Sequence, residues 1–133
     1  MKKLVAALLV VPAIAHADSW SHSTMRGLDL YQASGAGGIA VNVICDPARV
    51  YGSDNSGIEL QLGAAGAPSG PVVFKAEGTS LEATAFRGRI GPNAPAWSAM
   101  LDLLGAEGAV QIEHGGAVYS LDLQGPAAFS CSA

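Results

Sequence analysis

The feature that most constrains the fold of this chain is a series of short segments in which apolar and polar side chains alternate. The clearest is 39–45, where Ile39, Val41, Val43 and Cys45 share one face of an extended chain. A period of two residues with β-branched side chains is typical of a β-strand with one buried face. Similar runs occupy residues 28–32, 58–62, 72–77, 81–86, 109–113 and 117–123. Residues 18–27 are expected to form a first edge strand or an arm, so the chain is predicted to contain six to eight short antiparallel strands.

Glycine and proline separate these runs. Gly115-Gly116 lies between two alternating segments and predicts a tight hairpin, because glycine readily adopts the positive φ that such turns need. Residues 63–71 and 88–95 are rich in glycine, alanine and proline and are expected to be connecting loops. Residues 52–57 form a turn cluster, in which the side chains of Asp54 and Asn55 are expected to bond their own backbone.

One segment has the period of a helix. Its large apolar side chains are spaced as one helical stripe: Trp97, Met100, Leu101 and Leu104. Pro95 stands near the start of this helix, and Gly105 is placed to end it. The fold class is therefore mainly β: a small antiparallel β-sandwich or partly open barrel, with one short helix before the last hairpin. Residues 127–131 are expected to add a short closing helical turn.

The N-terminal segment has the pattern of a removable signal peptide. Lys2 and Lys3 precede an almost unbroken apolar run over 4–14, and Ala15 and Ala17 are the small residues that a signal peptidase recognises. The apolar run is too short to cross a bilayer. Residues 1–17 are therefore predicted to be a signal peptide of bacterial type and 18–133 a single β-rich exported domain, periplasmic or secreted, with no integral membrane association after cleavage.

The charge balance argues against one class of partner. Cleavage after Ala17 would leave 116 of the 133 residues, with five basic and eleven acidic side chains. A domain with this excess of acid lacks the basic face that phosphate backbones require. No nucleic-acid partner is expected.

The two cysteines, Cys45 and Cys131, are predicted to form a structural disulfide. Disulfides persist in the oxidising periplasm and outside the cell, and two cysteines allow a single pairing. The alternative is a catalytic or metal-binding pair. Neither cysteine has a neighbouring histidine, and the chain has no Cys-x-x-Cys spacing.

No catalytic or metal-binding motif stands out in the predicted exported domain. Its two histidines, His22 and His114, fall in the N-terminal arm and in the predicted hairpin turn, where exposed histidines are common. A zinc site needs three or four convergent ligands, so no metal or cofactor is expected. The tripeptide beginning at Ser53 matches one motif of the serine β-lactamases, but their other motifs do not occur in this sequence.

Three residues are candidate partner contacts. Arg87 and Arg89 form a small basic cluster that could clamp a carboxylate or another anion, or could instead balance nearby acids at a solvated strand end. Trp20 could anchor a partner from the polar N-terminal arm, or could pack over one end of the sandwich.

The C-terminal part of the chain resembles a known family. A helix over 96–104 is followed by Gly-Ala-Val-Gln-Ile, a Gly-Gly hairpin and Tyr-Ser-Leu-Asp-Leu-Gln-Gly-Pro before Cys131, and an earlier strand ends at Cys45. This arrangement is similar to small exported Gram-negative proteins of the invasion-associated locus B type. The resemblance implies a β-rich exported domain that affects the envelope or host interaction, and it implies no catalytic residue.

The sequence thus favours a non-enzymatic exported module that binds a protein or envelope component of unknown identity, through a strand edge or a loop. One variant of this hypothesis is an inhibitor of a cell-wall hydrolase, which would present 53–57 or 87–89 to the active site. A small hydrolase with a dispersed site, using His114 as base, is an alternative. So is a carrier of a small apolar ligand. The sequence predicts no particular oligomeric state.

Overall fold

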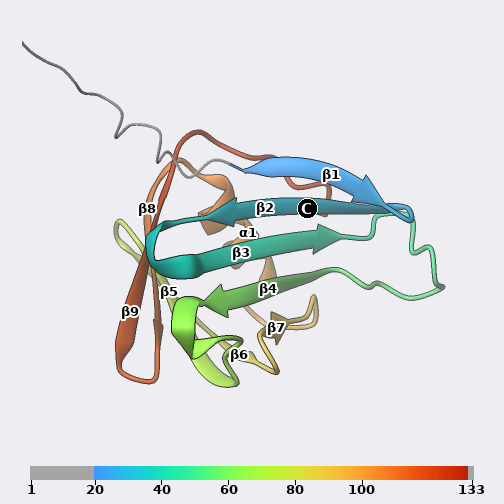
Figure 1. Ribbon diagram of the computed structural model, residues 1–133. Coiled ribbons are helices and arrows are strands. Elements are labelled where there is room, and N and C mark those ends of the chain that lie inside the picture. The colour runs from blue at the N-terminus through green and yellow to red at the C-terminus, as the bar shows by residue number, and fades with distance from the viewer. Residues whose placement is uncertain (1–19, 132–133) are drawn as a thin grey trace, which may run out of the picture.

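The alternating segments form two antiparallel β-sheets in the computed structural model, which describes residues 20–131 (Figure 1). The five-stranded sheet has the order β1-β2-β3-β4-β7, and the four-stranded sheet has the order β6-β5-β8-β9. The strands of the first sheet are β1 (Ser21–Met25), β2 (Leu28–Ser34), β3 (Ile39–Cys45), β4 (Gly57–Leu62) and β7 (Arg89–Ile90). Those of the second are β5 (Gly70–Ala76), β6 (Thr79–Ala85), β8 (Gly108–His114) and β9 (Ala117–Leu123). The predicted signal peptide, 1–17, lies outside the described residues.

The core lies between the two sheets. In β3 the odd-numbered residues from Ile39 to Cys45 are buried and the even-numbered ones are partly exposed, as the alternation predicts. The β3–β4 register places Val41 opposite Leu60 and Val43 opposite Ile58, so the buried residues of neighbouring strands share the inner face. In the second sheet, Phe74 of β5 lies opposite Ile112 of β8, and both side chains are buried on the inner face. The fold-class prediction of a mainly β, sandwich-like domain with one short helix is confirmed.

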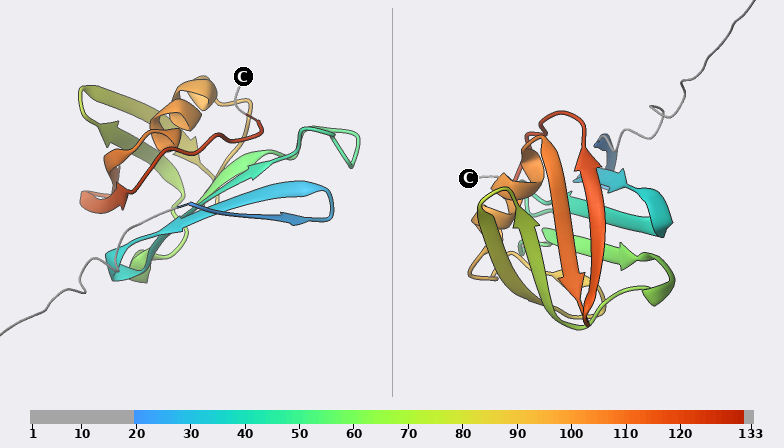
Figure 2. Two further views of the ribbon diagram at one scale, coloured as in Figure 1. Left: turned by 90° about the horizontal axis from the view of Figure 1, so that it is seen from above. Right: turned by 90° about the vertical axis from the view of Figure 1, so that its left-hand side faces the viewer.

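The single α-helix of the described chain, α1 (Trp97–Gly105), packs beside the four-stranded sheet, as both views of Figure 2 show. Met100, Leu101 and Leu104 point into the core. The carbonyl of Gly105 accepts a hydrogen bond from Ala127 N at 2.9 Å. A Cβ at residue 105 would lie 2.7 Å from Ala127 O, so the close approach of the C-terminal segment requires glycine there.

Three details differ from the sequence-based expectations. The described chain has nine strands, because the expected loop 88–95 contains the two-residue strand β7, which pairs with β4. A short 3₁₀ helix, Gly63–Ala65, occupies part of the expected loop 63–71, and β5 already begins at Gly70. The expected helical turn over 127–131 does not form, since these residues run along the end of α1 and only then turn.

The C-terminal segment is fastened to the five-stranded sheet. Cys45 and Cys131 form a disulfide with a Cα–Cα distance of 5.1 Å, as predicted. Phe129 packs edge-on against both Trp20 and Tyr31, with ring centroids 5.0 Å apart in each pair. The disulfide and the aromatic cluster therefore close one end of the core. Within the described residues, no helix has the length and apolar character needed to cross a membrane.

Candidate functional site

The loop between β3 and β4, residues 46–56, projects beyond the strands at one end of the molecule (Figures 1 and 2). We call it the β3–β4 loop. Its first residue, Asp46, is only 2% exposed, and its carboxylate accepts hydrogen bonds from other parts of the loop. One carboxylate oxygen of Asp46 accepts the backbone N–H of Val50 at 3.0 Å, and the other accepts that of Asn55 at 3.1 Å. The carboxylate thus joins the two arms of the loop.

A second set of hydrogen bonds fixes the end of the loop. Ser56 is buried, and its hydroxyl donates to Asp54 Oδ1 at 2.6 Å and accepts the N–H of Asp46 at 3.0 Å. The N–H of Ser56 donates to the same Asp54 oxygen, which is the expected side chain-to-backbone turn. From the neighbouring strand, the guanidinium of Arg89 donates to the carbonyl of Asn55 at 2.7 Å. The β3–β4 loop is therefore a bonded structure with fixed ends, although it has no regular secondary structure between them.

These bonds also shift two ionisation equilibria. Burial acts to raise the pKa of Asp46, but the hydrogen bonds from Val50, Asn55 and Arg49 outweigh it and lower the pKa overall. The hydrogen bonds from Ser56 lower the pKa of Asp54. Both carboxylates are therefore ionised at neutral pH, in the state that accepts all of these hydrogen bonds.

The outer part of this loop carries large apolar side chains that face solvent. Val50 is 41% exposed and Tyr51 is 63% exposed. Met25, at the end of β1, is 57% exposed. The hairpin turn that follows Met25 touches the β3–β4 loop, because a Cβ at Gly27 would lie 2.8 Å from Cγ1 of Val50.

The hairpin turn after Met25 and the β3–β4 loop therefore adjoin at this end of the molecule, and each also carries an arginine, Arg26 and Arg49. Both arginines are exposed, and both adopt positive φ, 53° and 50°. We call the set of Met25, Arg26, Arg49, Val50 and Tyr51 the loop-tip surface. Methionine, tyrosine and arginine are enriched at protein–protein interfaces, and tyrosine and arginine are enriched among the residues that dominate binding energy.

The three predicted partner contacts differ in how far their side chains are engaged within the fold. Trp20 is half-buried, and its Nε1 donates to the carbonyl of Leu104 at 3.1 Å, so its indole is engaged within the fold. Arg89 is also engaged, with Glu59 Oε2 at 2.9 Å and with the β3–β4 loop. Arg87 is exposed in a two-residue turn, 5.3 Å from the ring centroid of exposed Phe86. Of the three, Arg87 presents the most accessible side chain.

A serine, an aspartate and a histidine meet near the C-terminal end, but not in catalytic order. Ser130 Oγ donates to Asp29 Oδ2, and the other oxygen of Asp29 lies 3.3 Å from His22 Nε2. In a catalytic triad the histidine bridges serine and acid, so that it can take the serine proton. Here Asp29 lies between Ser130 and His22, and the His22 ring stacks on that of Tyr31 with a centroid distance of 4.5 Å. The arrangement holds the C-terminal segment in place, and its hydrogen bonds from Ser130 and His22 lower the pKa of Asp29.

The other histidine of residues 20–131, His114, lies at the end of β8. Its Nδ1 is 2.9 Å from the carbonyl of Pro71, and it lines a shallow hollow of about 330 Å³ with the Gly115-Gly116 turn. None of the residues lining this hollow is a serine, threonine or cysteine that could serve as a nucleophile. Among residues 20–131, no group of three or more His, Cys, Asp or Glu side chains is arranged to hold a metal ion.

Sequence reasoning missed the loop-tip surface. The signal was a short apolar pair, Val50-Tyr51, placed between Pro47 and Gly52 in a segment that otherwise has the composition of a turn. Apolar side chains in a turn have no strand or helix face to bury them. Comparison of the chain with family models, with curated proteins and with solved structures found no match.

Proposed function

We propose that this protein is a non-enzymatic exported module that binds a protein of the cell envelope through its loop-tip surface. The observation that carries the proposal is the combination of exposed Val50 and Tyr51 with a loop whose ends are fixed by hydrogen bonds. A loop that is already ordered loses little conformational entropy when it binds, so its contacts contribute more to affinity. Solvent-exposed tyrosine on such a loop is a typical anchor.

Two properties of the sequence support export. The first is the signal-peptide pattern of residues 1–17, and the second is the pair Cys45 and Cys131, whose disulfide is suited to an oxidising compartment. The resemblance of the C-terminal segment to invasion-associated locus B proteins points to the same compartment, and it stays a prediction. We place the mature protein in the periplasm or outside the cell.

A second candidate function is inhibition of a cell-wall hydrolase. Glycoside hydrolases hold a pair of carboxyl groups in an open cleft. The projecting β3–β4 loop carries the exposed side chains of Arg49 and Tyr51, a cation and an aromatic ring, which suit a cleft of that kind. In this version the exposed residues 49–51 enter the cleft, and 53–57 serve as the support behind them. An assay of lysozyme activity with and without the purified protein tests it.

Site-directed photo-crosslinking in the producing cell tests the main proposal. A photo-reactive phenylalanine analogue in place of Tyr51 is expected to give a discrete adduct with one envelope protein. The matched control places the same analogue at Phe86, which is 72% exposed and belongs to another part of the surface. An adduct of the same mass from both positions, or none from position 51, would count against the loop-tip surface.

A substitution pair separates binding from folding. Val50→Ser with Tyr51→Ser is expected to abolish capture of the crosslinked partner, whereas Val118→Ser, at a residue 54% exposed on β9, leaves capture unchanged. All variants should keep the same thermal midpoint within a few degrees, because exposed side chains contribute little to stability. Equal capture by the double variant and the wild type would overturn the proposal.

A further inference from the structure

A second surface feature lies in the four-stranded sheet, where β5 ends beside β8. The two strands pair only from Val73 opposite Glu113 to Lys75 opposite Gln111. Continued in the same register, the ladder would place Ala76 opposite Val110, but the pairing stops before that point. Strand β5 ends at Ala76, one residue beyond the last pair, so the beginning of β8, residues 108–110, is paired with β9 but not with β5.

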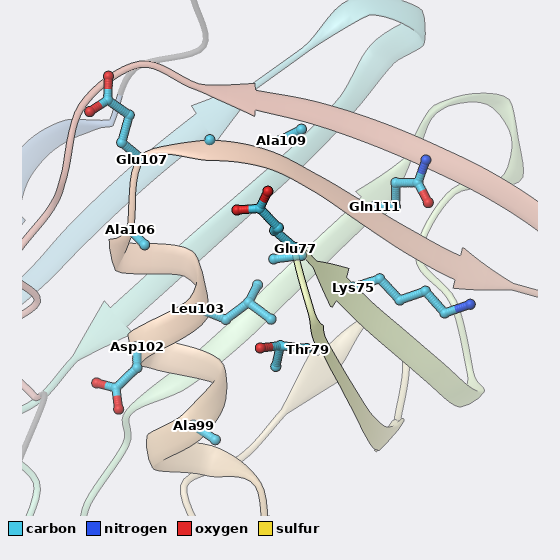
Figure 3. Close-up of a pocket in the computed structure, with 12 residues that line it drawn as sticks. Lys75, Glu77, Thr79, Ala99, Asp102, Leu103, Ala106, Glu107, Ala109 and Gln111 are labelled. Carbon is cyan, nitrogen blue, oxygen red and sulfur yellow. The ribbon is translucent and has the colours of Figure 1, made fainter.

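This unpaired edge of β8 lines a cleft of about 1050 Å³, shown in Figure 3. Helix α1 forms one wall, the beginning of β8 forms another, and the β5–β6 hairpin closes the remaining side. The apolar part of the lining consists of short side chains and one leucine: Ala76, Ala99, Leu103, Ala106 and Ala109. We call this space the β5–β8 cleft. It includes no residue of the loop-tip surface.

The charge around the β5–β8 cleft is mainly negative. Glu77 stands on the hairpin turn, Asp102 on α1 and Glu107 on the connection from α1 to β8. The lining has one cation, Lys75, whose ammonium already pairs with Glu113 at 2.9 Å. The carboxylate of Glu77 points over the cleft, whereas those of Asp102 and Glu107 stand at its rim and point outward (Figure 3). A basic ligand therefore meets Glu77 in the cleft and the other two carboxylates at its edges.

We propose that the β5–β8 cleft binds an extended, basic peptide segment of another protein. An extended chain fits beside the edge of β8 that β5 leaves unpaired, because it can run along residues 108–110 as an added strand and use the main chain there. Alternate side chains of such a segment point to opposite sides. Small residues would then face the alanine-rich floor, and lysine or arginine residues would reach Glu77, Asp102 and Glu107. This site is separate from the proposed function and does not depend on it.

A titration followed by NMR tests this inference, with a short amidated peptide of alternating lysine and alanine as the probe. Saturable amide shifts are expected in residues 75–79 and 106–111 at low salt, and they should weaken as salt screens the ion pairs. A peptide of alternating serine and alanine should bind about tenfold more weakly, since several partly exposed ion pairs are lost. Shifts spread over the whole acidic surface, or no saturable shifts, would overturn the proposal.

Two variants of the cleft, each with a matched control, make the test more specific. The triple change Glu77→Gln, Asp102→Asn and Glu107→Gln should weaken peptide binding about tenfold. Glu82→Gln removes an exposed carboxylate of β6 outside the cleft and should change nothing.

The second substitution blocks the cleft by volume. Ala99→Trp fills the cleft from the exposed side of α1 and should abolish binding. The control is Ser98→Trp, because Ser98 is also exposed but does not line the cleft, and this variant should bind as the wild type does. Amide spectra of the free variants show whether each is folded. Folded variants of the cleft that bind as tightly as the wild type would contradict the inference.

Discussion

Asp29 and Cys45 face each other across the β2–β3 ladder, and each holds one of two consecutive residues of the C-terminal segment. The carboxylate of Asp29 accepts a hydrogen bond from the hydroxyl of Ser130, and Cys45 forms the disulfide with Cys131. The N–H of Ser130 also donates to the hydroxyl of Tyr31 at 3.1 Å. A covalent bond and hydrogen bonds therefore fix the same short segment at the same place on the sheet.

The first prediction concerns the disulfide. Cys45→Ala with Cys131→Ala is expected to lower the free energy of unfolding by about 4–5 kcal/mol in the chain-entropy model, because the bridge closes a long loop in the unfolded chain. Urea denaturation of the oxidised wild type and the double variant measures the difference. The hydrogen bonds of Ser130 should keep the variant's native spectrum similar in the absence of denaturant. A difference below about 1 kcal/mol would show that the bridge constrains the unfolded state little.

The second prediction concerns pH. The pKa values of Asp29, Asp46 and Asp54 are all lowered in the folded protein. A lowered pKa contributes stability that is present above the unfolded value of about 3.9, and that is lost as pH falls through the folded value. The free energy of unfolding is therefore expected to be level between about pH 5 and 7 and to decrease below about pH 4.

Denaturant unfolding at a series of pH values measures this curve, and Asp46→Asn serves as the comparison. The variant has no charge at this position, so its stability should be lower at neutral pH and should change less as the solution is acidified. Acid profiles of the same slope in both proteins would show that Asp46 does not contribute to the transition.

The limits of sequence reasoning follow from these particulars. Strand β3 was predicted with its observed bounds, because Ile39, Val41 and Val43 alternate for long enough to show a period. Strand β7 has only Arg89 and Ile90, and two residues have no period. It forms because Ile90 meets Ile58 across the sheet, a contact between residues that are distant in the sequence.

The candidate site shows the same limit. The turn chemistry of Asp54 and Asn55 is local, and the sequence predicted it. Val50 contacts the turn at Gly27 because the β1–β2 and β3–β4 hairpins lie side by side. This arrangement cannot be predicted from a local sequence pattern. For Arg89 the sequence left two interpretations open, a partner contact or a residue that balances nearby acids at a strand end, and it did not identify the acid. The bonds of Arg89 to Asn55 and Glu59 appear only when β4 and β7 pair.

The third prediction separates the two roles of Arg89. Its pair with Glu59 is partly exposed, with side chains 38% and 42% accessible, so Glu59→Gln should cost less than about 1 kcal/mol. Arg89→Gln also removes the donors to the carbonyls of Asn55 and Ser56 and should cost about 1–3 kcal/mol. Chemical denaturation of both variants measures the difference, with Arg87→Gln as the exposed control. Equal losses from the two main variants would mean that the carbonyl contacts contribute nothing.

The fourth prediction concerns Trp20. Trp20→Phe keeps an aromatic ring against Phe129 but removes the bond to Leu104 O, and it should cost about 1 kcal/mol. Trp20→Ala also removes the ring contact and should cost about 2–3 kcal/mol, below the value for a fully buried tryptophan. Thermal unfolding of both variants measures the two steps. If Trp20 contributed only to binding, both variants would unfold with the wild-type midpoint.

The fifth prediction tests whether the two hairpins of the loop-tip surface act as one unit. Gly27 has a φ of 84°, and a Cβ there would lie 2.8 Å from Cγ1 of Val50. Gly27→Ala should therefore destabilise the protein through two effects: about 1–2 kcal/mol of backbone strain, and displacement of Val50. Val50→Ala relieves only the second effect. The double variant is expected to be more stable than the two single changes would give by addition, with a coupling of about 0.5 kcal/mol or more. Urea denaturation of the four proteins gives this value, and strict additivity would show that the β1–β2 turn and the β3–β4 loop are independent in solution.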